Sequence, residues 1–440
     1  MKKISILLLG LAALYSCSND PTASFETNVS NYAAESSHSV SYEDALATAI
    51  SFMADESIST RTVSSFKVKN HYEYHANKGT RSAGEDSIDV RFHVINFSDD
   101  GGFALVSADD RTTPVYAYSS DGNLDLEDAI ANTGFGSFMS RAATFYEQEI
   151  ESSGIILGRF DPSPEYIQKV TSAPVEYYNG VPYYVITTYT FNSSKSALIS
   201  ANWNQCDPYN YYNSYTPNIG TNYCNKWPAG CGPVAIGQVC SYYQFPTVTD
   251  YNGSTVHFNW SNINSQSSYA VGDHSGTALN MAYLLKIIGV NAYSEYTTNN
   301  GTAITLTTMD GVDSALTSFN YISSGKTICT TSSQMQSDLF TSLNSNRPVI
   351  LLGDNDYDSS DVHIFVVDGY TRYRQHKDYY DMSYPYPKMF STTPNVYKNY
   401  FHCNWGWGGL YNAYVLDFQA AYNIKYNTNL EYIFNIHPNN

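Results

Sequence analysis

Four residues have types and a chain order that suit nucleophilic attack on a carbonyl carbon: Gln205, Cys231, His363 and Asn404. A cysteine attacks as a thiolate, and a nearby imidazolium lowers the pKa of the thiol and stabilises its charge. An asparagine side-chain oxygen can hold that imidazole in one orientation. A glutamine amide can donate to the oxygen that becomes negative during the attack. The order therefore predicts acyl transfer through a covalent intermediate.

Cys231 stands where a loop turns into a helix. Pro228–Pro233 form that loop, and Pro233 suits a first helical turn because its missing N–H has no partner there. The start of a helix offers unpaired N–H groups and a partial positive charge, and both favour a thiolate. Taken alone, Cys231 would more often be a buried small residue or half of a disulfide.

His363 supplies a base for Cys231. It precedes the apolar run Ile364–Val367, and a strand starting there would hold the imidazole at the rim of a sheet. It follows Cys231 by 132 residues (363 minus 231), which lies within the spacing of papain-type enzymes. His402 is the rival base, but it lies in a predicted strand directly before Cys403, where we expect a structural role.

Asn404–Gly409 is an aromatic, glycine-rich segment. Trp407 can cover the contact between His363 and Asn404 from water, which strengthens a hydrogen bond. The glycines let the backbone turn tightly beside the rings. The alternative is a tight aromatic turn of the kind any β-rich protein can contain, and Gln205 carries little signal by itself.

The bulk composition excludes some partners. The chain has 440 residues, a formal net charge of −18 and a pI of about 4.8. Nucleic-acid binding needs a basic surface, so no nucleic-acid partner is expected. Only 15% of residues are charged, and 41 tyrosines help to supply polarity instead. No cofactor is expected. The sequence contains no Cys-x-x-Cys pair, so a structural zinc site is not predicted.

The N-terminal segment predicts export. Lys2–Lys3 precede the apolar run Ile4–Leu14, which is too short to span a membrane. Leu14–Cys17 then resembles the lipobox of bacterial lipoproteins, which implies lipidation of Cys17; a plain secretory signal is the alternative. Contact with membrane is expected only through this anchor. The expected location is the outer membrane, with surface display suggested by Asp20, or the medium after maturation.

Six cysteines remain besides Cys17: Cys206, Cys224, Cys231, Cys240, Cys329 and Cys403. Export places them in a compartment that permits disulfides. If Cys231 is a free thiolate, at least one of the other five is also unpaired. Cys206 and Cys224 are the favoured pair, with other pairings left open.

An acidic loop over residues 354–361 precedes His363 and could be considered for calcium. The EF-hand pattern fails there because Ser359 stands where glycine is needed. A solvated loop is the favoured interpretation.

Periodicity predicts two folded parts. In the first, a helix over 41–54 with Ser41 as N-cap and Asp44 in its first turn precedes strands near 89–97, 103–107 and 114–118 and a helix over 137–151. Residues 160–196 carry four prolines and predict an exposed connection, where proteolytic nicking concentrates. In the second part, helices at 233–245 and 277–288 precede strands at 349–352, 364–367, 399–403 and 414–418, the order of a helical layer packed on an antiparallel sheet.

These segments together resemble the streptopain family of bacterial cysteine peptidases. Ala229–Ala235 resembles the nucleophile segment of that family, His363–Gly369 its histidine segment and Trp203–Asn210 its glutamine segment. Asn404–Gly409 matches the family's hallmark closely. Gly101–Arg111 resembles the inhibitory propeptide of the family.

The resemblance implies an α+β protein in which a smaller α+β inhibitory prodomain precedes a papain-like catalytic domain, a helical layer packed on an antiparallel sheet or barrel. It implies a zymogen that acts on protein or peptide substrates after its prodomain, an intramolecular inhibitor, is removed by proteolysis. Cys231 is then the nucleophile and His363 the proton acceptor, with Gln205, Asn404 and Trp407 completing the catalytic set.

The expected divisions are a signal at 1–17, a tether at 18–24, the prodomain at 25–150, a connection at 151–196 with the maturation site near 190–197, and the peptidase at 197–440. A monomer is expected.

Three features depart from the family pattern. Val362 replaces a glycine before the histidine, Ile364 replaces a small residue, and residues 373–400 are longer than expected and predict an extra loop at the cleft. Two alternatives stay open. A surface lipoprotein could bind glycan or protein through its aromatic residues, although this leaves the Cys–His–Asn order unexplained. A papain-fold inhibitor could act on another peptidase.

Overall fold

The structure is a computed structural model that describes residues 38–54, 66–75, 90–125, 129, 133–152, 176–178, 181–216, 224–299, 301–355, 358–381, 388–392, 394, 396–417 and 430–439. The predicted signal with Cys17, the tether and part of the acidic loop before His363 lie outside these residues. Among the helices described, none combines the length and the apolar character needed to cross a membrane.

The N-terminal part packs two helices with a four-stranded run of sheet. Its elements are α2 (Tyr42–Ala54), β1 (Val68–His75), β2 (Val90–Phe97), β3 (Phe103–Ser107), β4 (Val115–Ser119) and α4 (Thr133–Ser152). The predicted cap of α2 is confirmed, because Ser41 Oγ accepts from the Asp44 N–H at 3.2 Å and donates to the Asp44 carboxylate at 3.0 Å.

Residues 91–97 of β2 are all buried, including the polar side chains of Arg91, His93 and Asn96. Arg91 can be buried because its guanidinium donates to Glu147 and to the Ala143 carbonyl, both on α4. His93 is satisfied by the Val40 carbonyl at 2.9 Å. Both faces of this strand are therefore covered, and its polar residues are paired.

The C-terminal part has a helical layer and the rest of the sheet. The helices are α5 (Cys231–Tyr243), α6 (Trp260–Ile263), α7 (Gly276–Asn291), α8 (Met309–Ser318) and α9 (Ser332–Asn344). The strands that follow are β12 (Thr327–Ile328), β13 (Val349–Asn355), β14 (Asp358–Asp381), β15 (Lys388–Thr392), β16 (Val396–Asn404), β17 (Ala413–Leu416) and β18 (Glu431–Ile433). α5, α7 and α8 share one apolar core with β13 and β14, so the predicted α+β class is confirmed.

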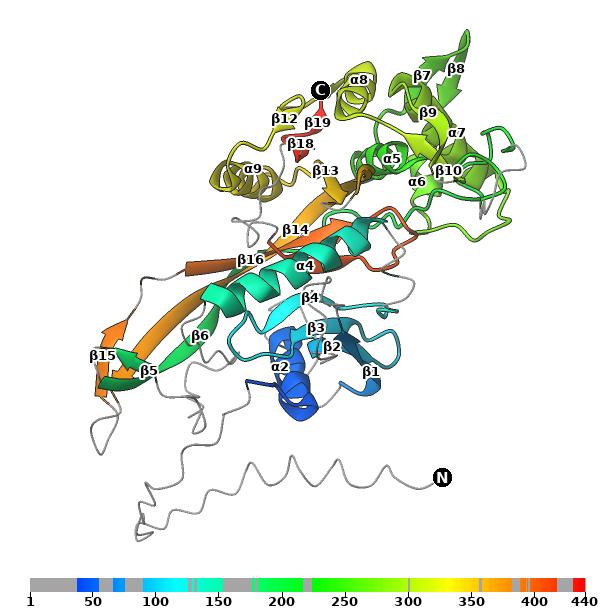
Figure 1. The fold of residues 1–440 in the computed structure, drawn as a ribbon. Helices are drawn as coiled ribbons and strands as arrows, with labels where there is room; N and C mark the ends of the chain where they lie inside the picture. The colour runs from blue at the N-terminus through cyan, green and yellow to red at the C-terminus, as the bar shows by residue number, and fades with distance from the viewer. Residues whose placement is uncertain are drawn as a thin grey trace, which may run out of the picture. The chain divides into compact units, whose positions relative to one another are not determined.

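One sheet runs through both parts, in the order β1-β2-β3-β4-β17-β16-β14-β13-β18-β12. The junction is the antiparallel pair of β4 with β17, in which Tyr118 faces Tyr414 and Ala117 faces Val415. Figure 1 shows α4 lying along the sheet beside β14 and β16. The N-terminal part is thus hydrogen-bonded to the C-terminal part through the backbone as well as through side chains.

The structure corrects the part of the predicted exposed connection that it describes, residues 176–178 and 181–195. β5 (Glu176–Tyr178) and β6 (Val181–Lys195) are strands, and β6 pairs with β14 from Tyr183 opposite Asp381 to Lys195 opposite Tyr370. Tyrosine and threonine recur in β6, and both residue types are common in strands. The predicted cleft loop at 373–400 is also corrected, because β14, β15 and β16 occupy most of it and extend the sheet toward β5 (Figure 1).

Candidate active site

The loop before α5 presents Cys231 at the first residue of that helix. Gly230 takes a positive φ of 97°, which favours glycine, and a Cβ there would lie 2.9 Å from Thr305 Cγ2. A Cβ at Gly232 would lie 2.7 Å from Thr307 Cβ. No side chain caps the helix at Gly230, so its first N–H groups remain available to a negative sulfur.

Cys231 and His363 are brought together by α5 and β14. Burial is the largest single influence and raises the pKa of the Cys231 thiol, but the hydrogen bond and charge of His363, together with the backbone N–H groups of Ile364 and Gly232, lower it by more. The net pKa of the thiol lies below its ordinary value. Cys231 is half-buried and not bonded to another cysteine. This pair can therefore form a thiolate and an imidazolium.

The ring of His363 is oriented by a backbone carbonyl. His363 Nε2 lies 2.8 Å from the Trp405 oxygen, and it must be the donor because a carbonyl only accepts. This differs from the predicted role of Asn404. The Asn404 side-chain oxygen accepts from Gln238 Nε2 at 2.9 Å and from the Gly406 N–H at 3.3 Å.

Asn404 is held in that arrangement by its own amide, which donates to the Ala201 carbonyl at 2.9 Å. The residue is 1% exposed, so its polar atoms must find partners within the protein. The asparagine therefore organises the backbone that presents the Trp405 carbonyl. Direct orientation of His363 by Asn404 stays a prediction.

Gln205 lies in the segment that pairs with the nucleophile loop. Its carbonyl accepts from the Ala229 N–H at 2.8 Å, two residues before Cys231. Its own N–H donates to the Asn204 side chain at 2.6 Å, and the residue is buried. These contacts fix the Gln205 backbone close to Cys231, as an oxyanion-hole residue requires.

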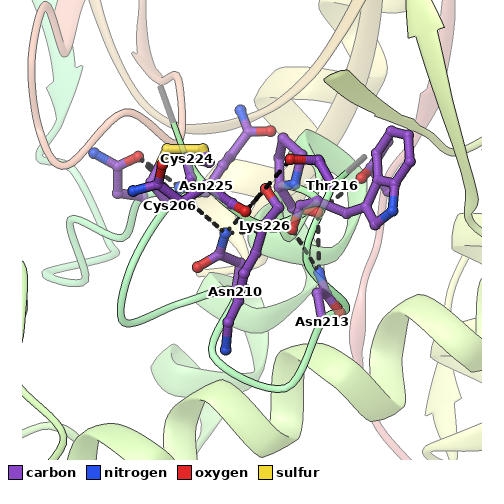
Figure 2. Close-up of a disulfide and its surroundings, with 12 residues drawn as sticks. Cys206, Asn210, Asn213, Thr216, Cys224, Asn225 and Lys226 are labelled. Carbon is purple, nitrogen blue, oxygen red and sulfur yellow. Dashed lines mark hydrogen bonds between the residues drawn. A yellow bond between two sulfur atoms is a disulfide. The ribbon is translucent and has the colours of Figure 1, made fainter. Parts of the chain in front are cut away.

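A disulfide ties the same two segments together. Cys206 and Cys224 are bonded, so the favoured pairing is confirmed (Figure 2). Around it, the Asn210 amide donates to the Trp227 carbonyl at 3.3 Å and the Asn213 amide donates to the Pro228 carbonyl at 3.1 Å. The backbone that leads to Cys231 is thus anchored covalently and by hydrogen bonds to the segment that carries Gln205.

Trp407 lies against the imidazole of His363, with ring centroids 6.5 Å apart and planes 27° apart. Gly406, Gly408 and Gly409 all take positive φ, as the predicted tight turn beside the rings requires. The Gly408 N–H donates to the Trp203 carbonyl at 2.8 Å, which closes this turn onto the Gln205 segment. The rival base His402 lies on β16 with its Nδ1 2.6 Å from the buried Asp368 carboxylate, in a structural role.

The start of α4 covers the histidine. A Cβ at Gly134 would lie 2.6 Å from Trp405 Cε3 and 2.8 Å from His363 Cδ2, so only a glycine backbone fits there. Phe135 packs edge-on against the Trp405 ring, with centroids 6.3 Å apart. The N-terminal part therefore rests directly on the imidazole of His363.

A polar cluster fastens the other end of α4. The Glu149 carboxylate accepts from the Thr113 N–H at 2.7 Å, from the Tyr116 hydroxyl at 2.8 Å and from Lys398 Nζ at 3.1 Å. Lys398 belongs to β16 of the catalytic part. Two further contacts cross the same junction, from Tyr118 to Thr371 and from Tyr400 to the Val115 carbonyl.

Sequence reasoning missed Trp405 as the orienting group, since a backbone carbonyl leaves no side-chain signal. It also missed Gln238, which is fully buried and bonds both Asn404 and the Ala201 carbonyl. A polar Gln in an otherwise apolar helix over 231–243 was the available signal.

With this geometry in place, comparison with known proteins is decisive. Residues 203–415 match the Peptidase C10 family, and residues 37–144 match the Spi protease inhibitor family. The peptidase domain belongs to the C10, or streptopain, family.

The C10 peptidase is 22% identical to streptopain of Streptococcus pyogenes over 375 residues, covering 76% of this chain and 78% of that protein. Its fold is similar to that of a prointerpain A fragment from Prevotella intermedia, with a TM-score of 0.51 and 16% identity, over 83% of this chain and 98% of the fragment. The chain is thus a cysteine protease zymogen with an inhibitory propeptide.

Proposed function

We propose that this C10 peptidase hydrolyses peptide bonds in proteins through an acyl-enzyme on Cys231, and that it is exported and activated by proteolytic removal of its N-terminal domain. The observation that carries the proposal is the contact of Cys231 with His363 at the start of α5, where the pKa of the thiol is lowered. A lowered pKa at a helix start beside a histidine is the usual setting of a nucleophilic cysteine.

In the first half-reaction, the Cys231 thiolate attacks the carbonyl carbon of the scissile bond and the carbonyl electrons move to oxygen. The Gln205 amide and a backbone N–H at Cys231 stabilise that oxyanion, each donor contributing about 3 kcal/mol. The intermediate collapses, the C–N bond breaks, and His363 gives its proton to the leaving amine.

In the second half-reaction, His363 takes a proton from water while the water attacks the acyl carbon. The carbon–sulfur bond then breaks and the thiolate returns. Trp407 shields the imidazole from solvent throughout. Activity should fall in acid, as the Cys231 thiolate takes up a proton.

The inhibitory contact supports the activation step. Gly134 lies on His363 and Trp405, so substrate and α4 compete for the same space beside the base. Removing the N-terminal domain frees that space.

Export rests on the sequence of the first 17 residues, with lipidation of Cys17 as the anchor to the outer membrane. Lipidation of Cys17 is tested by expressing the full chain and its Cys17→Ser variant in the presence of labelled palmitate. Label and membrane recovery should both be lost in the variant, and label retained by the variant would refute lipidation at Cys17.

The catalytic proposal is tested with the chain lacking residues 1–17, incubated with casein under reducing conditions beside Cys231→Ala and Cys329→Ala. Cys329 is a matched control because it is also half-buried and unbonded. The wild-type chain and Cys329→Ala should each process themselves to a shorter form and should degrade casein. The Cys231→Ala chain should keep its full length. Cleavage of casein by the Cys231→Ala chain would refute Cys231 as nucleophile. So would a wild-type chain that stays inactive after another protease has removed its N-terminal domain.

A further inference from the structure

A cluster of metal-ligand side chains lies on β1 and β2 of the inhibitory domain. His71 and Glu73 come from β1 and His93 from β2. His71 Nε2 and His93 Nδ1 are 3.0 Å apart, and these nitrogens and a Glu73 carboxylate oxygen all lie within 4.8 Å of one another. None of these residues takes part in the chemistry proposed for Cys231.

The strand register explains why the three side chains meet. His71 and Glu73 are two apart on β1 and so point to the same face of the sheet. Glu73 lies directly opposite His93 in the antiparallel pair, and His71 lies opposite Ile95, one diagonal step away. The backbone of two paired strands therefore holds all three ligands, without any mobile loop.

His93 is already oriented as a ligand. Its Nε2 lies 2.9 Å from the Val40 carbonyl, so that nitrogen carries the proton and Nδ1 presents a lone pair toward His71. A histidine that donates its second N–H to a backbone carbonyl is the common arrangement at metal sites. The Tyr42 ring packs on His71, with centroids 4.5 Å apart, and restricts that imidazole as well.

We propose that His71, Glu73 and His93 bind a divalent transition metal, with Zn²⁺ the ion that suits the site best. Two imidazole nitrogens and one carboxylate oxygen are a common zinc ligand set. Two nitrogens bound to a tetrahedral zinc lie about 3.3 Å apart, close to the separation present here. The metal takes the place of the proton between the two rings, and His71 then carries its hydrogen on Nδ1. Glu73 is exposed, so water can supply the fourth ligand.

A second cluster in the same domain does not qualify. His38, Asp109 and Asp110 also lie close together, but His38 Nδ1 is already 2.8 Å from the Asp110 carboxylate. Asp109 is held by the Arg111 guanidinium through both carboxylate oxygens. A metal there would have to displace the His38–Asp110 hydrogen bond and the Arg111–Asp109 ion pair.

The site has a consequence for latency, which rests on the proposed activation by removal of this domain. The metal would clamp β1, a terminal strand of the sheet, to β2 and through His93 to Val40 beside α2. An ion that binds only the folded domain stabilises it. Metal-loaded zymogen should therefore be processed more slowly than the chelator-treated protein.

The site is tested in the chain lacking residues 1–17 with Cys231→Ala, which cannot process itself and lacks the reactive thiol. After chelator treatment, the protein is titrated with Zn²⁺ by calorimetry and with Co²⁺ by visible absorption. One ion should bind per chain, with the Co²⁺ bands of a nitrogen- and oxygen-ligated site, and the unfolding temperature of the inhibitory domain should rise. His71→Ala and Glu73→Gln should each weaken binding at least about tenfold.

His38→Ala, which removes the neighbouring cluster, should leave the affinity unchanged. Glu73→Gln keeps the proposal falsifiable, since an exposed isosteric change preserves the fold. Absence of binding, or binding by His71→Ala and Glu73→Gln that is as tight as binding by the parent protein, would overturn the site. Because this protein is catalytically inactive by design, that failure is independent of whether Cys231 is the nucleophile.

Discussion

His363 donates to the Trp405 carbonyl at 2.8 Å, while the side-chain oxygen of the adjacent Asn404 accepts from Gln238 at 2.9 Å. The base is thus oriented by the backbone of a segment whose shape the asparagine maintains. His363 is also hydrogen-bonded to Cys231. The Trp405 carbonyl therefore fixes the tautomer of the imidazole, while the other contact of the ring stabilises the Cys231 thiolate.

The first prediction concerns the pH dependence of Cys231. Alkylation of the precursor by iodoacetamide should be half-maximal below the ordinary thiol pKa of about 8.5, because His363 and the backbone N–H groups of Ile364 and Gly232 together lower the pKa of the thiol by more than burial raises it. His363→Ala leaves burial without that compensation, so the midpoint should move upward. Asn404→Ala should not move it in the precursor. A downward or unchanged midpoint in His363→Ala would contradict the contact.

Gly134 provides the second prediction. Gly134→Leu places a side chain where a Cβ already lies 2.6 Å from Trp405, so α4 must move off the histidine. Release of the N-terminal domain should be faster, measured as the rate of size reduction on gels. Gln148→Leu, a half-buried position further along α4, is the matched control and should process like wild type. Equal rates in the two variants would show that α4 does not restrain the site through Gly134.

The third prediction concerns the pair of Glu149 and Lys398, whose side chains are each 16% exposed. Lys398→Met removes the cation and leaves a partly buried carboxylate, at a cost of about 1–3 kcal/mol. The affinity of the inhibitory domain for the processed enzyme should fall about tenfold for each 1.4 kcal/mol of binding free energy that is lost. Binding of the separately added domain to the processed enzyme measures this. Lys326→Met, which breaks the exposed pair with Asp310, should have no effect.

The fourth prediction concerns where maturation cuts the chain. β6 is paired with β14 up to Lys195, and Leu198 and Ile199 are bonded to Asp368. Only Ser196 and Ala197 are exposed between these two anchored stretches, too few to enter a peptidase cleft in extended form. The mature N-terminus should therefore precede β6, so that β6 stays in the enzyme. N-terminal sequencing of the processed protein decides this, and a first residue within 190–197 would contradict it.

The fifth prediction concerns the disulfide. Removing a bridge that spans 18 residues should cost about 3 kcal/mol of unfolding free energy. Because the bridge joins the Gln205 segment to the loop before Cys231, Cys206→Ala/Cys224→Ala should also lower kcat. Denaturant unfolding and casein hydrolysis measure the two effects. A variant with reduced stability but unchanged kcat would show that the bridge does not position the oxyanion hole.

Much of the architecture could be predicted because local rules and burial agreed. The α2 cap, the β2–β3 hairpin and the start of α5 follow from capping residues, alternation and a proline in the first turn. β6 could not be predicted, because its pairing partner lies about 180 residues away, in β14. Prolines and polar residues near 182–196 then resembled a loop.

The site was predictable where side-chain chemistry is decisive and unpredictable where the backbone acts. Cys231 and His363 stand out by type and spacing, and the structure brings them into contact. The Trp405 carbonyl and the Gly134 contact depend on three-dimensional packing alone. The cluster of His71, Glu73 and His93 was likewise hidden, because its ligands come from two strands and follow no short spacing.

The pairing of β4 with β17 has a consequence that begins only after activation. When the inhibitory domain dissociates, β17 becomes an edge strand with unpaired N–H and C=O groups, which can pair with another strand. The released β4 retains the complementary edge, so the liberated fragment can return in trans and act as a product inhibitor. The edge of β17 is only Ala413–Leu416, short enough to limit self-association of the enzyme. Full activity should therefore lag behind the cut until the fragment is degraded or diluted.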